Sequence, residues 1–193
     1  MTNNTFHLAP AVLLAAALLS ACRDKEKPRP DNPPAPNEEE LITTLELHFH
    51  QMGGGEHKHF VWRDLDGDGG DPPMIMADTL TTGLTYHVSM EVLNEGATPV
   101  DSITAEILAE GDEHQFFFQV AGANVTVAYD DADANGDPIG LASTWTVGAA
   151  SSGTVTVILR HQPNKGAPGV SGGDITNAGG ETDIEVTFPL VVQ

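Results

Sequence analysis

Cysteine is almost absent from this chain: Cys22 is the only one among 193 residues, so no disulfide can form within the chain. Basic residues are also scarce, with 8 Lys and Arg against 28 Asp and Glu and a formal net charge of −20. Such a chain repels phosphate, which makes nucleic acid a poor partner, and it attracts cations. The composition therefore favours cations as ligands.

Motifs for common reactions are lacking as well. The sequence contains no GxSxG elbow, no HExxH pair and no phosphate-binding glycine loop. His114 and His161 form a conceivable catalytic pair, but no Ser or Cys nucleophile motif accompanies them. We interpret both as structural histidines, and we expect neither an enzymatic reaction nor an organic cofactor.

The first residues differ from the rest of the chain. An apolar run from Leu8 to Leu19, interrupted only by Pro10, suits the core of a signal peptide and is too short to span a membrane. The string Leu19-Ser20-Ala21-Cys22 that follows resembles a lipobox, where the cysteine thiol takes a diacylglycerol. No Lys or Arg precedes the run, and an ordinary secretory signal is the alternative. We predict a lipoprotein signal peptide at 1–21 and lipidation at Cys22.

Residues 23–37 hold five prolines, many charges and no large apolar side chain. Such a segment buries too little surface to offset the entropy of ordering it, so we predict a lipidated cysteine and stalk at 22–37 and a folded domain at 38–193. Arg23 follows the cysteine, in place of the Asp that favours retention in the inner membrane of enteric bacteria. We expect a lipid anchor in the outer membrane, with the domain periplasmic or surface-exposed.

The remaining sequence indicates strands almost throughout, rich in Val, Thr and Phe and separated by Gly, Asp, Asn or Pro. One helix is expected at Asp101–Glu110, with Asp101 as its N-cap. Trp145 and Phe116–Phe118 are expected in the core. The pattern predicts an all-β, immunoglobulin-like sandwich of about eight or nine strands with at most one short helix, although the Cys–Trp–Cys signature is absent. The predicted strands are Ile42–His50, His57–Leu65, Met74–Leu80, Thr85–Leu93, Gln115–Val120, Asn124–Tyr129, Ser143–Val147, Thr154–His161 and Asp183–Val192.

The first two strands flank Gly53-Gly54-Gly55 and predict a hairpin. Apolar residues alternate along both strands, and they share a face only if Leu47 pairs with Phe60 and Leu45 with Trp62. Cross-strand neighbours have Cβ atoms about 5 Å apart, so imidazoles on the opposite face could share Zn²⁺, Cu²⁺ or Ni²⁺. A histidine-rich face that serves solubility or pH response is the alternative. The predicted transition-metal ligands are His48, His50, His57 and His59.

Two loops carry oxygen ligands at alternate positions followed by glycine, which is the opening half of a calcium loop. Both lack the bidentate Glu at position 12, since Ile75 and Ala142 stand there. Ordinary turns use the same residue types. The calcium ligands that this pattern predicts are Asp64, Asp66 and Asp68 in the first loop and Asp131, Asp133 and Asn135 in the second.

Five strings occur in order across 38–193: Glu38–Leu45, Arg63–Gly69, Glu113–Gln119, Leu159–Pro163 and Gly179–Phe188. Together they resemble a family of Bacteroidetes lipoproteins whose members often carry the label "type 1 periplasmic binding fold superfamily protein". The resemblance implies an outer-membrane lipoprotein without assigned catalytic residues. A periplasmic binding fold has two α/β lobes, for which this domain is too short and too poor in helix, so the strand pattern decides the fold.

These observations predict a non-enzymatic binding or accessory lipoprotein that captures metal ions or assists nutrient uptake. Its expected partners are the membrane, through the lipid anchor, and an outer-membrane receptor or another envelope protein. The alternative is a structural or adhesive cell-envelope module braced by Ca²⁺.

Overall fold

The computed structural model describes Met1 and residues 41–67 and 70–193. The predictions for Cys22, the signal peptide and the stalk lie outside these ranges, as does Asp68 of the first calcium loop. From Leu41 to Gln193 the described residues belong to one compact unit.

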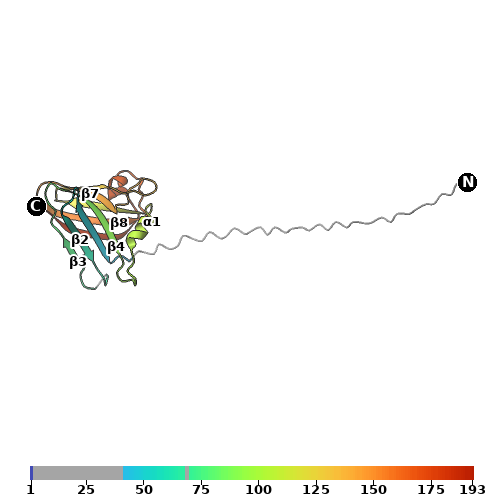
Figure 1. Ribbon diagram of the computed structural model, residues 1–193, viewed down its shortest axis with the longest axis horizontal. Helices are drawn as coiled ribbons and strands as arrows, with labels where there is room; N and C mark the ends of the chain where they lie inside the picture. Colours follow the sequence, from blue (N-terminus) through green and yellow to red (C-terminus); the bar gives the residue numbers. More distant parts are fainter. Residues whose placement is uncertain (2–40, 68–69) are drawn as a thin grey trace. The chain divides into compact units, whose positions relative to one another are not determined.

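This unit is built of strands, as the alternation of apolar and polar residues predicts, with one α-helix (Figure 1). The helix α1 (Ile103–Ala109) buries Ile103 and Ile107, and two 3₁₀ turns, η1 (Val170–Gly172) and η2 (Ile175–Asn177), follow the eighth strand. The strands are β1 (Thr44–Gln51), β2 (His57–Arg63), β3 (Met74–Ala77), β4 (Thr85–Leu93), β5 (His114–Ala121), β6 (Val125–Tyr129), β7 (Ala142–Val147), β8 (Ser151–His161) and β9 (Glu181–Val192).

The strands form two antiparallel sheets, in the orders β3-β2-β1-β4-β7-β6 and β5-β8-β9. An immunoglobulin constant-type domain has the orders A-B-E-D and C-F-G. With β1, β4, β7 and β6 as A, B, E and D, and β5, β8 and β9 as C, F and G, the topology is the same. The strands β2 and β3 are an insertion between A and B that widens the first sheet. The predicted all-β sandwich is confirmed.

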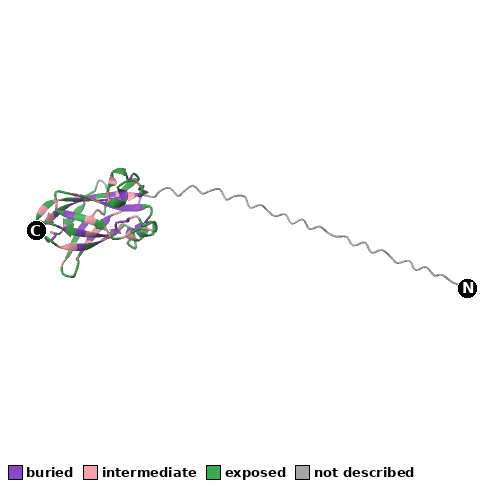
Figure 2. Cartoon of the chain, turned by 90° about the horizontal axis from the view of Figure 1, so that it is seen from above, coloured by how far each residue is buried: buried purple, intermediate pink, exposed green. Residues whose placement is uncertain are grey.

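The core lies between the sheets because alternate side chains of each strand point inward, as the alternating buried and exposed positions in Figure 2 show. Phe49 of β1 is fully buried, and its ring centroid lies 4.7 Å from that of Phe60 and 5.1 Å from that of Trp145. Phe116 of β5 and Phe188 of β9 supply aromatic side chains from the other sheet. The outer face of the wide sheet carries mostly polar side chains, with the apolar Val61, Met74 and Met76 at its β2–β3 edge.

Several element boundaries differ from the expected ones by one to three residues, and two of these differences have a clear cause. The N-cap of α1 is Ser102, because the backbone of Asp101 pairs with Asn94 in an antiparallel bridge. The strand β3 ends at Ala77 and not at Leu80, whose backbone instead forms a parallel bridge with Val192 of β9. Both differences come from long-range pairing, which local sequence does not encode.

Candidate metal-binding face

The outer surface of the first hairpin carries the four predicted histidines. His48 lies opposite His59, and His50 lies opposite His57. The ring centroids are 5.0 Å apart in the first pair and 4.6 Å apart in the second. Gly54 in the connecting turn has φ of +89°, a conformation that glycine adopts without steric cost. The predicted register is therefore confirmed.

A third strand, β4, extends this surface with residues that the sequence reasoning missed. β4 pairs with β1 on the side away from β2, which places His87 opposite His50 and Glu91 opposite Glu46. The alternation in β4 does indicate that His87 and Glu91 face outward. It does not tell which strand β4 pairs with. We call the five histidines with Glu46 and Glu91 the histidine face.

The closest potential ligands on the histidine face surround His48. Its Nε2 lies 3.4 Å from Glu46 Oε2 and 3.5 Å from Glu91 Oε2. The three ligand atoms all lie within 4.8 Å of one another. Because His59 packs edge-on against the His48 ring, two imidazoles and two carboxylates occupy adjacent positions on three strands.

The electrostatics of the face favour neutral imidazole at His50. Loss of contact with water lowers the pKa of His50, and the neighbouring His57, His48, His87 and His59 lower it further. Neutral imidazole is the form that binds metal ions.

At the β4 side of the histidine face, His87 Nδ1 lies 3.3 Å from Asp130 Oδ2. The same Asp130 oxygen accepts a hydrogen bond from Thr144 Oγ1 at 2.7 Å. A carboxylate held in this way fixes the orientation of an imidazole, as the outer partners of metal-binding histidines do.

The carboxylates of the first aspartate loop take part in turns. Asp64 Oδ1 accepts a hydrogen bond from the Gly67 N–H at 2.9 Å, and Asp66 Oδ2 accepts one from the Asp71 N–H at 2.8 Å. Each of these two carboxylates has a second oxygen that could meet a cation. Calcium binding at this loop stays a prediction.

The second aspartate loop is organised around a lysine that sequence reasoning did not connect with it. Lys165 Nζ, which is buried, donates to Asp133 Oδ2 at 3.0 Å, to the Pro138 carbonyl at 2.9 Å and to the Gly111 carbonyl. Burial acts to raise the pKa of Asp133, but hydrogen bonds from Lys165 and from two backbone amides outweigh it and lower the pKa.

The carboxylates of Asp131 and Asp133 also accept hydrogen bonds from nearby backbone N–H groups. Asp131 accepts the N–H groups of Gly140 and Ala142 at 2.8 and 2.9 Å. The Asn135 N–H donates to Asp133 Oδ1 at 2.8 Å. The Lys165 ammonium group is thus bonded to Asp133, one of the three predicted calcium ligands of this loop. Calcium binding at Asp131, Asp133 and Asn135 stays a prediction.

No protein-family model, curated protein or solved structure matches this chain. Among the described residues, no helix is long and apolar enough to span a membrane.

Proposed function

We propose that this protein is a non-enzymatic, lipid-anchored envelope protein that captures divalent transition-metal ions on the histidine face. The anchor at Cys22 and the outer-membrane location rest on the lipobox-like string. The metal-binding role rests on the arrangement around His48.

The observation that carries the proposal is a pair of like charges with a metal ligand between them. Glu46 and Glu91 are direct cross-strand partners, and like charges at such positions destabilise a sheet. His48 approaches both carboxylates from the same face. A cation bound among the three side chains would relieve the repulsion.

The distances suit a tetrahedral ion. Two atoms bound tetrahedrally to one zinc ion at about 2.0–2.2 Å are about 3.3–3.6 Å apart. The separations from His48 Nε2 to the two carboxylate oxygens, 3.4 and 3.5 Å, lie in that range. His59, whose ring centroid lies 5.0 Å from that of His48, is a candidate for a fourth ligand.

The ligand set selects among metals. Imidazole nitrogen with carboxylate oxygen suits Zn²⁺, Cu²⁺ and Ni²⁺, whereas Ca²⁺ takes six to eight oxygens. His50, His57 and His87 form a neighbouring row along the same face. The strongly acidic chain, with a net charge of −20, would raise the local concentration of cations at this surface.

Calorimetric titration with Zn²⁺ tests the proposal. The full chain carrying Cys22→Ser, which removes its only thiol, is freed of metal with a chelator and compared with Glu91→Gln in the same background. Loss of one ligand is expected to weaken binding at this site at least about tenfold, or 1.4 kcal/mol. Glu106→Gln is the matched control, since it removes the same charge from the exposed side of α1.

Equal zinc affinity in Glu91→Gln, Glu106→Gln and the parent chain would refute the site. The anchor has its own test, which is incorporation of labelled fatty acid in the bacterial host. Labelling is expected for the unmodified chain and not for Cys22→Ser. Labelling of both would show that the lipid is attached elsewhere.

A further inference from the structure

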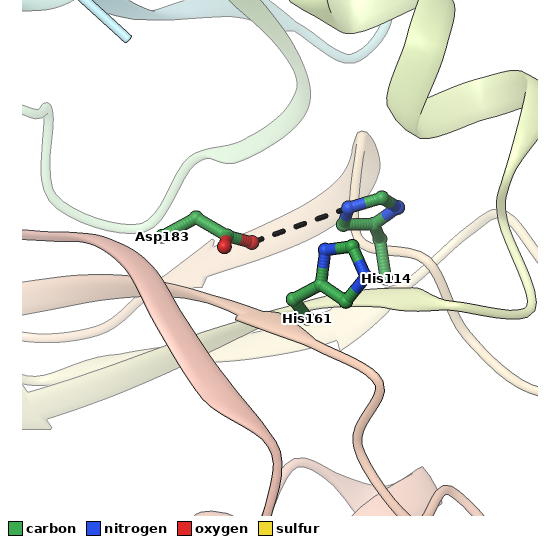
Figure 3. Close-up of side chains that lie close together, drawn as sticks. All are labelled: His114, His161 and Asp183. Atoms are coloured by element: carbon green, nitrogen blue, oxygen red, sulfur yellow. Dashed lines mark ion pairs between the residues drawn. The ribbon is translucent and has the colours of Figure 1, made fainter. Parts of the chain in front are cut away.

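A second group of potential metal ligands lies in the other sheet, away from the histidine face. His114 begins β5 and His161 ends β8, and these two residues are direct cross-strand partners. Their ring centroids are 4.6 Å apart. Asp183 of β9 completes the group, and the ligand atoms of the three residues all lie within 4.8 Å of one another (Figure 3).

An irregularity in β9 turns Asp183 toward the histidines. Ile184, Val186 and Phe188 point into the core, so strict alternation would place Asp183 on the outside. The register shifts at Leu159/Arg160: Ile184 pairs with Leu159 and Thr182 with Arg160, which leaves Asp183 as the extra residue of a bulge. Its side chain is only 3% exposed. Bulges redirect side chains in this way and are common beside functional sites.

The hydrogen bonding of His114 defines its tautomer. Its Nδ1 lies 3.2 Å from the backbone carbonyl oxygen of Glu110. A carbonyl only accepts, so Nδ1 carries the proton, and in the neutral ring the lone pair is on Nε2. Burial lowers the pKa of His114, which favours the neutral ring. Donation to a carbonyl is the usual second contact of a metal-binding histidine.

This lone pair faces a carboxylate. His114 Nε2 and Asp183 Oδ2 are 4.0 Å apart, and the two side chains are 0% and 3% exposed. Two ligand atoms of a tetrahedral zinc ion lie about 3.3–3.6 Å apart, so this pair has to close by about half an ångström to hold one ion. Binding of His161 as well requires the three ligand atoms, which lie within 4.8 Å of one another, to close to the same separations.

A route for a small ion exists on the carboxylate side. A cleft of about 520 Å³ has Asp183 in its lining, together with Asp64, Asp66 and Glu185. Four acidic side chains around one cleft attract cations toward Asp183.

We propose that His114, His161 and Asp183 form a second, buried binding site for one divalent transition-metal ion, with its remaining coordination position taken by water from the cleft. Two imidazoles and one carboxylate, without a thiolate, suit Zn²⁺ or Co²⁺. The site does not depend on the proposed capture of metal ions at the histidine face.

The test removes the histidine face first. A full chain carrying Cys22→Ser and the substitutions His48→Ala, His50→Ala, His57→Ala, His59→Ala and His87→Ala, called here the face-deleted chain, is titrated with Co²⁺ and followed by visible absorption. One equivalent of Co²⁺ is expected to bind and to give the ligand-field bands of a four- or five-coordinate ion. Asp183→Asn and His161→Gln in that chain are expected to abolish these bands. Asp101→Asn, an exposed control, is expected to keep them.

Thermal unfolding gives a second readout. Zn²⁺ at 100 times its Kd is expected to raise the Tm of the face-deleted chain by about 5–10 °C and to leave that of Asp183→Asn unchanged. X-ray absorption on the zinc-loaded face-deleted chain needs no further substitution and is expected to show two imidazole ligands.

Absence of Co²⁺ binding to the face-deleted chain would overturn the second site. So would bands that persist in both Asp183→Asn and His161→Gln, or zinc bound with fewer than two imidazoles. None of these results bears on Glu91→Gln, which tests the histidine face in the otherwise intact chain. The two proposals can therefore fail separately.

Discussion

Replacement of Lys165 by methionine is expected to destabilise the domain because it leaves Asp133 as a buried, uncompensated carboxylate. The two side chains are 5% and 2% exposed, and Nζ lies 3.0 Å from Asp133 Oδ2. The ammonium group also donates to the carbonyls of Gly111 and Pro138. Its removal therefore takes a partner from three buried acceptors.

Removal of one member of a buried ion pair typically costs about 3–5 kcal/mol. For a domain of this size each kcal/mol shifts Tm by about 2–4 °C, so the expected fall in Tm is about 6–20 °C. The pair of Lys58 with Glu56, at 3.2 Å and about one quarter exposed, is a matched comparison. Lys58→Met is expected to cost at most about 1 kcal/mol.

Urea unfolding at pH 7 measures these free energies. Asp133→Asn combined with Lys165→Met is expected to be more stable than Lys165→Met alone, because the uncompensated charge is gone. A loss of under about 1 kcal/mol in Lys165→Met, no greater than that in Lys58→Met, would refute the account of this ion pair.

Three further predictions concern Asp133, Phe49 and Gly180. The pKa of folded Asp133 is lowered from 3.8, so its stabilising contribution is present above that pH and is lost as the pH falls below it. The difference in free energy of unfolding between the parent chain and Lys165→Met should therefore narrow from pH 5 to pH 3. A constant difference would contradict this. Phe49→Ala is expected to cost about 3–5 kcal/mol in urea unfolding, as its ring is fully buried; a cost under 1 kcal/mol would show that the core does not depend on this ring. Gly180→Ala is expected to lower stability by about 1–3 kcal/mol, because Gly180 has φ of +70° and a Cβ atom there would meet the His161 carbonyl; an unchanged Tm would argue against this backbone conformation.

The hairpin shows which features were accessible from the sequence. β1 and β2 are joined by a short glycine turn and have clear alternation, so only one register buries Leu47 and Phe60 together. That register places His48 beside His59, as observed. Local pairing of this kind needs no knowledge of the rest of the fold.

The other ligands depend on pairing between distant segments. Glu91 reaches His48 because β4 pairs with β1, although about 40 residues separate them, and many other pairings were compatible with the alternation. Asp183 faces His114 through a bulge that reverses the side expected from the pattern. Lys165 reaches the second aspartate loop from the long β8–β9 connection. The calcium ion predicted at that loop rested only on its pattern of Asp, Asn and Gly residues.

The most direct test of metal capture at the histidine face is a crystal structure of the zinc-loaded full chain carrying Cys22→Ser, with anomalous scattering used to locate zinc. The account predicts an anomalous peak about 2.0–2.2 Å from His48 Nε2 and from the carboxylates of Glu46 and Glu91. A well-ordered histidine face without zinc, in crystals grown with excess zinc, would contradict it.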